Sequence, residues 1–77
     1  MGTRKINWLD VDEIGCQLCE QHPDRDPLSI RFTELRAMVE ALSDFEPAPQ
    51  QQVNEQILEA IQMAWHAEYE DLHEDEH

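Results

Sequence analysis

Two cysteines and a histidine follow one another at three-residue spacing in the run CQLCEQH, residues 16–22. Such groups can bind zinc or carry thiol redox chemistry. A structural zinc site needs four ligands, and no second Cys/His pair follows Cys16, Cys19 and His22 at a suitable spacing. A redox pair starts at a helix N-terminus, whereas Cys16 falls about two turns inside a predicted helix. We expect no zinc knuckle, but a half-buried Cys19 and an exposed Cys16.

Carboxylates gather on the outward side of the same predicted helix and in the loop after it. They are Asp12, Glu13, Glu20, Asp24 and Asp26. Clustered carboxylates bind hard cations such as Ca²⁺, Mg²⁺ or iron. An EF-hand is excluded, because a loop starting at Asp24 would put Ser29 at the required glycine and Leu35 at the bidentate glutamate. The pattern predicts either weak cation binding or only a solvated acidic face.

A second set of metal-ligand types lies near the C-terminus, at His66, Glu70, His73 and His77. Imidazoles at helical spacing can share a metal ion. This segment is polar on all sides, however, which makes a stable helix doubtful. We therefore predict that residues 66–77 form a frayed acidic tail that contains histidines.

The charge of the chain is strongly negative and uneven. Eighteen acidic residues against five Lys and Arg give a net charge of −13, and no Lys or Arg follows Arg36. Such a field repels nucleic acids and anionic membranes and attracts cations and basic protein surfaces, although it could also serve solubility alone. No apolar run approaches the roughly 20 residues of a membrane span, and no signal-peptide pattern is present. We expect a cytoplasmic location, where thiols stay reduced.

The apolar spacing predicts three helices. Asp10 caps the first, with Glu13 as capping-box partner and Leu9 and Ile14 as a hydrophobic staple, and His22-Pro23 ends it. Asp26-Pro27 predicts a short turn over residues 28–30, before a brief extended piece at residues 30–32. Thr33 caps the second helix, whose apolar stripe is Leu35, Met38, Val39 and Leu42.

The third predicted helix follows a linker at residues 43–52, which Phe45 anchors to the core. Asn54 caps this helix, and Val53 and Leu58 form its staple. Its buried face consists of Ile57, Leu58, Ile61, Ala64 and Trp65. The length of the chain allows one domain over residues 1–77.

Three segments carry a further signal: NWLDVDEIG (7–15), HPDRDPLSIRFTEL (22–35) and NEQILEAIQMAW (54–65). In order and spacing they resemble the IscX (YfhJ) family of bacterial iron–sulfur cluster assembly proteins, over roughly residues 6–68. The resemblance implies a mainly α single domain of about three main helices, similar to a modified winged helix. It also implies a monomeric, non-enzymatic adaptor with no tightly bound cofactor.

The resemblance further implies the partner. It implies that an acidic face of the protein docks on a basic patch of the pyridoxal-phosphate cysteine desulfurase, in competition with bacterial frataxin. It also implies that the protein slows cluster formation and binds Fe²⁺ or Fe³⁺ weakly. Carried over by position, the core contains Trp8, Phe32 and Trp65. The predicted partner-binding residues, which include Glu20 from the same acidic side, are Asp10, Glu13, Glu20, Asp24, Asp26 and Glu34. Weak iron binding is assigned to Glu13, Asp24 and Asp26.

The chain departs from the family pattern at two places. The family's acidic loop, typically an FDDDP-like run, is FEPAP here at residues 45–49, which argues against an iron site on this loop. The Cys16/Cys19 pair lies outside the family signature. Two alternatives to the adaptor stay open: a small iron chaperone or sensor whose cation binding is itself the function, and a thiol oxidoreductase, which rests on the cysteine pair alone.

Overall fold

The described part of the chain forms three α-helices and one short 3-10 turn. The computed structural model describes residues 5–47 and 52–73. In chain order the elements are α1 (Val11–Gln21), η1 (Pro27–Ser29), α2 (Phe32–Glu40) and α3 (Glu55–His73). Within these residues, β structure is limited to one parallel bridge between Ile6 and Phe45. The prediction of a mainly α fold with three main helices is confirmed, while the winged-helix likeness stays a prediction.

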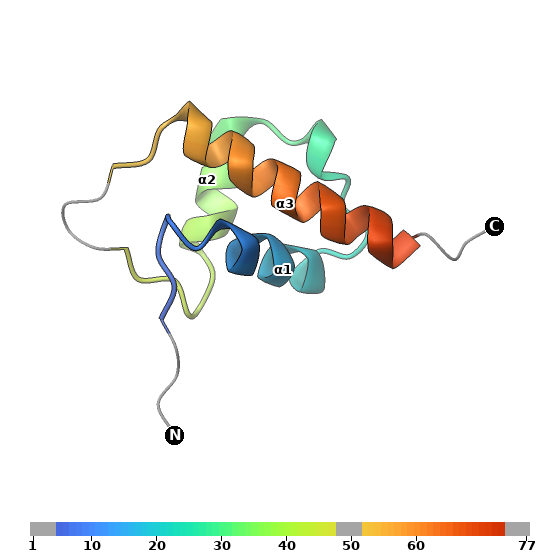
Figure 1. The fold of residues 1–77 in the computed structure, drawn as a ribbon, viewed down its shortest axis with the longest axis horizontal. Helices are drawn as coiled ribbons and strands as arrows, with labels where there is room; N and C mark the ends of the chain where they lie inside the picture. The colour runs from blue at the N-terminus through green and yellow to red at the C-terminus, as the bar shows by residue number, and fades with distance from the viewer. Residues whose placement is uncertain (1–4, 48–51, 74–77) are drawn as a thin grey trace, which may run out of the picture.

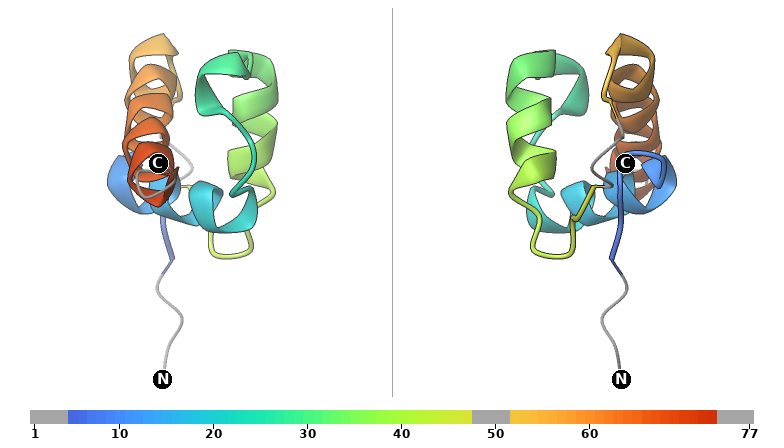
Figure 2. Two further views of the ribbon diagram at one scale, coloured as in Figure 1. Left: turned by 90° about the vertical axis from the view of Figure 1, so that its right-hand side faces the viewer. Right: turned by 90° about the vertical axis from the view of Figure 1, so that its left-hand side faces the viewer.

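The long helix α3 contacts every other element. Figure 1 shows α3 crossing the molecule, with α1 beneath it and α2 behind it. Seen end-on in Figure 2, α2 and α3 stand side by side, and α1 crosses from one to the other at their lower end. This arrangement encloses the apolar faces of the three helices. No helix within residues 5–47 and 52–73 is long and apolar enough to cross a membrane.

Apolar side chains from all three helices meet in one core. The largest fully buried side chain is that of Trp65, on the α3 face predicted from the apolar spacing. The buried apolar residues of the described chain are Ile6, Trp8, Ile14, Leu18, Cys19, Ile30, Leu35, Val39, Leu42, Leu58, Ile61 and Trp65. The helical periodicity of the sequence therefore identified most of the core, while Met38, Ile57 and Ala64 from the predicted stripes are half-buried.

Helices α1 and α3 approach each other closely at Gly15. A Cβ atom built there would lie 2.8 Å from Ala64 Cβ and 2.8 Å from the backbone nitrogen of Trp65. Real Cβ atoms essentially never approach other heavy atoms so closely. The absence of a side chain at residue 15 thus allows the backbone of α1 to pack directly against α3 at Ala64 and Trp65.

The chain enters α1 through a different cap from the one predicted. Asp10 precedes the helix but makes no side-chain cap hydrogen bond to it. Instead its carboxylate accepts a hydrogen bond from the Asn7 N–H at 2.9 Å, while Asn7 Oδ1 accepts one from the Leu9 N–H at 2.9 Å. These two hydrogen bonds, with that from the Asp10 N–H to the Asn7 carbonyl at 3.0 Å, close a turn over residues 7–10 just before α1. The predicted staple is wrong as well, because Leu9 is 70% exposed.

The reason for the earlier turn is the anchoring of the segment before it. The Ile6 N–H donates to the Asp44 carbonyl at 2.9 Å, and Ile6 accepts from the Glu46 N–H at 2.7 Å. Trp8 packs edge-on against Phe45, with ring centroids 4.7 Å apart. Burial of Ile6 and Trp8 therefore turns Leu9 outward, and the prediction that Phe45 anchors its loop to the core is confirmed.

The second helix begins before its predicted cap. Asp26 caps η1 as expected, accepting from the Leu28 N–H at 3.0 Å. The predicted cap of α2 at Thr33 is wrong, because the helix starts at Phe32 and its first backbone hydrogen bond joins the Leu35 N–H to the Arg31 carbonyl at 2.8 Å. Ile30 is extended and buried, so its anchoring in the core determines where the chain turns into the helix.

The third helix begins as predicted but extends further. Asn54 Oδ1 accepts from the Ile57 N–H at 2.9 Å, which is the expected N-cap. The frayed tail predicted from residue 66 is wrong as far as His73, where α3 ends. Tyr69 packs against the core, and His73 Nε2 lies 3.0 Å from the carbonyl oxygen of Pro23. These tertiary contacts stabilise a segment whose own sequence is polar; residues 74–77 lie outside the described chain.

The contact at Gly15 leads to a prediction about stability. Gly15→Ala should lower the free energy of unfolding by about 2 kcal/mol, since overpacking costs about 3 kcal/mol at its upper end and the better helix propensity of alanine returns about 1 kcal/mol. Denaturant unfolding followed by circular dichroism measures the change. Gln21→Ala, at the exposed end of α1, is the control and should not destabilise the protein. A Gly15→Ala protein as stable as the wild type would contradict the proposed packing.

Candidate functional site

The predicted partner-binding carboxylates are spread over the surface of several elements. In chain order they are Asp10, Glu13, Glu20, Asp24, Asp26 and Glu34. Asp10 is half-buried and the other five are exposed. Glu13 and Glu20 belong to α1, whereas Glu34 lies in the first turn of α2. The structure therefore makes these groups accessible without bringing all of them into one cluster.

Three of the six carboxylates already serve the fold. Asp10 binds the Asn7 N–H, and Asp26 caps η1. Glu34 forms an ion pair with Arg25, with both side chains close to half exposed. A carboxylate with a local partner contributes less to an external electrostatic field than an unpaired one. Glu13, Glu20 and Asp24 are therefore the stronger candidates for contacts with another protein.

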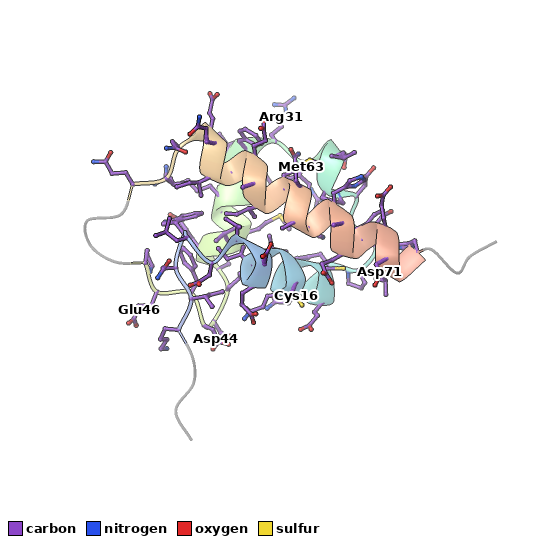
Figure 3. The ribbon with its side chains drawn as sticks, in the orientation of Figure 1. Cys16, Arg31, Asp44, Glu46, Met63 and Asp71 are labelled. Carbon is purple, nitrogen blue, oxygen red and sulfur yellow. The ribbon has the colours of Figure 1, made fainter. Side chains whose placement is uncertain are left out.

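Helix α3 adds two carboxylates that the sequence reasoning missed. Glu20, Glu68 and Asp71 line one pocket between α1 and α3, and the charges of Glu13, Glu20 and Glu68 all act on Cys16. Figure 3 shows Cys16 and Asp71 on the lower side of the molecule, from α1 and α3 respectively. We call the group Glu13, Glu20, Glu68 and Asp71 the α1–α3 acidic surface. It was missed because residues 66–77 were expected to leave the domain.

Little positive charge opposes this surface. Arg25 is paired with Glu34, and Arg36 lies 3.4 Å from Glu40 in an i,i+4 pair. Arg31, which is exposed, lies at the opposite edge of the molecule in Figure 3. With no Lys or Arg beyond residue 36, α3 contributes only negative charge apart from its histidines. The resulting electrostatic field attracts cations and basic protein surfaces to the α1–α3 acidic surface.

The carboxylates assigned to weak iron binding lie apart from one another, as expected for a site without a preformed cage. Within residues 5–47 and 52–73, no group of three or more His, Cys, Asp or Glu side chains is positioned to share a metal ion. Glu13 lies near the start of α1 and Asp24 beyond its end, so the helix rise alone separates them by about 12 Å. Asp26 uses its carboxylate as a cap. The assignment of weak iron binding to Glu13, Asp24 and Asp26 therefore stays a prediction, for carboxylates that do not form a preorganised ligand group in the described part of the chain.

The histidines of α3 make separate contacts. His66 Nε2 lies 3.5 Å from a Glu70 carboxylate oxygen, and the His73 ring packs against Tyr69 with centroids 4.3 Å apart. His73 also contacts the Pro23 carbonyl. The contact between His73 and Pro23 holds the end of α3 against the loop after α1, whereas the other two interactions lie within α3.

Both thiols are more buried than expected. Cys19 is 7% exposed and Cys16 is half-buried, because α3 continues past Trp65 and covers them. Burial raises the pKa of each thiol, and the nearby carboxylates Glu20 and Glu68 raise both further. Cys16 Sγ lies 3.8 Å from a Glu20 carboxylate oxygen. The neutral thiol is thus favoured, which argues against the activated thiolate of a redox enzyme.

Comparison with known proteins shows which sequences this chain is similar to. A family model described as iron-sulphur cluster assembly matches residues 6–70. The uncharacterized protein PA3808 of Pseudomonas aeruginosa is 45% identical over 60 residues, which cover 78% of this chain and 89% of that protein. The match begins at the buried Ile6 and includes α1, η1, α2 and most of α3. The chain therefore belongs to the IscX (YfhJ) family of iron–sulfur cluster assembly proteins.

Proposed function

We propose that this protein is a non-enzymatic, monomeric adaptor of the cytoplasm that binds the cysteine desulfurase of the iron–sulfur assembly system. The observation that carries the proposal is the concentration of negative charge on the α1–α3 acidic surface in a protein of this family. Complementary charge steers two proteins together and selects the partner, here a basic patch beside the desulfurase active site. By occupying this patch the adaptor would compete with bacterial frataxin and slow cluster formation.

The docking surface is inferred from exposed carboxylates that form no ion pair among the described residues. Glu13 is exposed on α1, and Glu20 lies on the same side of this helix about two turns further along. Asp24 follows in the loop after the helix. Glu68 and Asp71 of α3 extend the negative surface next to Glu20. We assign Asp10, Asp26 and Glu34 a smaller share of binding, because each already interacts within the chain.

Iron binding is proposed to be weak and distributed. Single carboxylates on a charged surface leave most of the coordination sphere of a hard cation to water. The described residues offer no three-ligand group, which favours the adaptor over an iron chaperone or sensor that retains its ion. Iron would then act as a counterion of the docking surface.

The electrostatic origin of docking is tested by salt. Raising the salt concentration from about 50 mM to about 500 mM shortens the Debye length to well below 10 Å, so the affinity for the desulfurase should fall sharply, mainly through a slower association rate. Surface plasmon resonance at several salt concentrations measures both rate constants. An affinity that does not change with salt would contradict docking through the acidic surface.

The location of the surface is tested by neutralising charges. Glu13→Gln combined with Asp24→Asn should weaken desulfurase binding about tenfold at low salt, or about 1.4 kcal/mol for two exposed ion pairs. The matched control combines Glu55→Gln and Glu59→Gln, exposed positions in the first turns of α3. This control removes the same net charge but lies about 13 Å or more along the helix from Glu68. Equal losses in both variants would show that only net charge matters.

Iron should bind with micromolar affinity or weaker, and Mg²⁺ or Ca²⁺ should compete with it. A triple variant, Glu13→Gln with Asp24→Asn and Asp26→Asn, should reduce iron binding and desulfurase binding together. The asparagine at residue 26 still provides a cap, so the fold should persist. Calorimetric titrations with iron and with desulfurase measure both effects. Tight, stoichiometric iron binding retained in this variant would instead support the chaperone alternative.

A further inference from the structure

The pocket between the C-terminal halves of α1 and α3 contains two thiols that the proposed adaptor function does not use. It has a volume of about 340 Å³ and is lined by both cysteines, by carboxylates and by apolar groups. Cys16 and Cys19 form one side, Pro23 and Leu72 provide apolar surface, and Glu68 and Asp71 belong to α3. Both thiols therefore face the same space rather than different sides of α1.

The spacing of the two thiols suits a bridging ligand. Residues three apart on a helix have Cβ atoms about 5–6 Å apart on one face, so two sulfur atoms can converge on a single ion. Thiolates are soft ligands that select ions such as Cu(I) or zinc. Zinc needs four ligands in a closed structural site, and no group of three or more ligands exists among the described residues. An ion satisfied by two sulfur ligands fits this pocket better than zinc or iron.

We propose that Cys16 and Cys19 form a two-coordinate site for a soft monovalent metal ion, with Cu(I) as the ion that matches this chemistry. Each thiol loses its proton and forms one sulfur–copper bond. One Cu(I) and two neutral thiols thus give a complex with a charge of −1 and two released protons, and no oxidant or reductant is consumed. The site is separate from the weak carboxylate binding proposed for iron and does not rest on docking to the desulfurase.

The surrounding carboxylates have two opposing effects on such a site. Glu13 and Glu20 of α1 and Glu68 and Asp71 of α3 attract a cation to the pocket. Their charges, together with burial, also raise the pKa of both thiols, so protons compete with the metal. Below the thiol pKa values, binding that displaces two protons should strengthen about hundredfold for each pH unit. A carboxylate site would have little such dependence above pH 6, because carboxylates are already ionised there.

The test is a titration of the reduced full-length protein with Cu(I) under anaerobic conditions, in competition with the chromogenic chelator bicinchoninate, between pH 6 and 8. We expect one ion per chain, an ultraviolet thiolate-to-copper charge-transfer band and the two-proton dependence. Cys16→Ser should weaken binding at least about hundredfold, and Cys16→Ser with Cys19→Ser should abolish the band. Circular dichroism verifies that each variant is folded. The single Cys16 variant keeps the test decisive if the buried residue 19 tolerates no change.

Matched variants distinguish this site from the acidic docking surface. Glu13→Gln with Asp24→Asn should leave the copper stoichiometry at one and keep the charge-transfer band, although it should reduce desulfurase binding. Cys16→Ser with Cys19→Ser should leave desulfurase binding within a few-fold. Three results would overturn the copper site: unchanged Cu(I) affinity in the double-cysteine variant, one ion shared between two chains, or an affinity that does not depend on pH.

Discussion

The close packing of α1 on α3 at Gly15 is the contact on which the rest of the molecule depends. Because residue 15 has no side chain, the backbone of α1 can approach Ala64 and Trp65 more closely than a Cβ atom at this position would allow. This approach buries Trp65 completely and aligns the remainder of α3 with α1. A larger separation of the helices would expose the core and would also remove the second wall of the pocket that contains the thiols.

The same packing determines how negative charge is distributed. A chain with a net charge of −13 gains nothing from bringing carboxylates together, yet Glu68 and Asp71 lie beside Glu20. Apolar burial, at roughly 25 cal/mol per Å², outweighs the screened repulsion between exposed charges. The carboxylates concentrated in this way are available to an external basic surface, whereas those that cap turns or pair with arginine are engaged within the chain. The proposed docking function can therefore rest on charge that packing has placed.

Two kinds of cation chemistry follow from two kinds of environment. Exposed, separated carboxylates interact with hard, hydrated cations and lack a shared coordination sphere. The paired thiols beneath α3 are sheltered and favour soft ions. Burial and negative neighbours, which keep these thiols protonated and poorly suited to redox catalysis, also make any metal binding compete with protons. The proposed sites therefore differ in ion, in pH dependence and in the residues that control them.

The sequence by itself determined the features that arise within a few residues: three helices, the cap at Asn54, the end of α1 at His22-Pro23 and the apolar stripes. The family could be recognised for the same reason, since the segments that carry the resemblance are short and local in the sequence. Only the tertiary structure decided which carboxylates are free and how far α3 extends. The contact from His73 to Pro23 joins residues 50 positions apart, and the pairing of Glu34 with Arg25 depends on how the loop folds. Helical periodicity and capping act over three or four residues, so they cannot reveal a surface assembled by packing distant segments together.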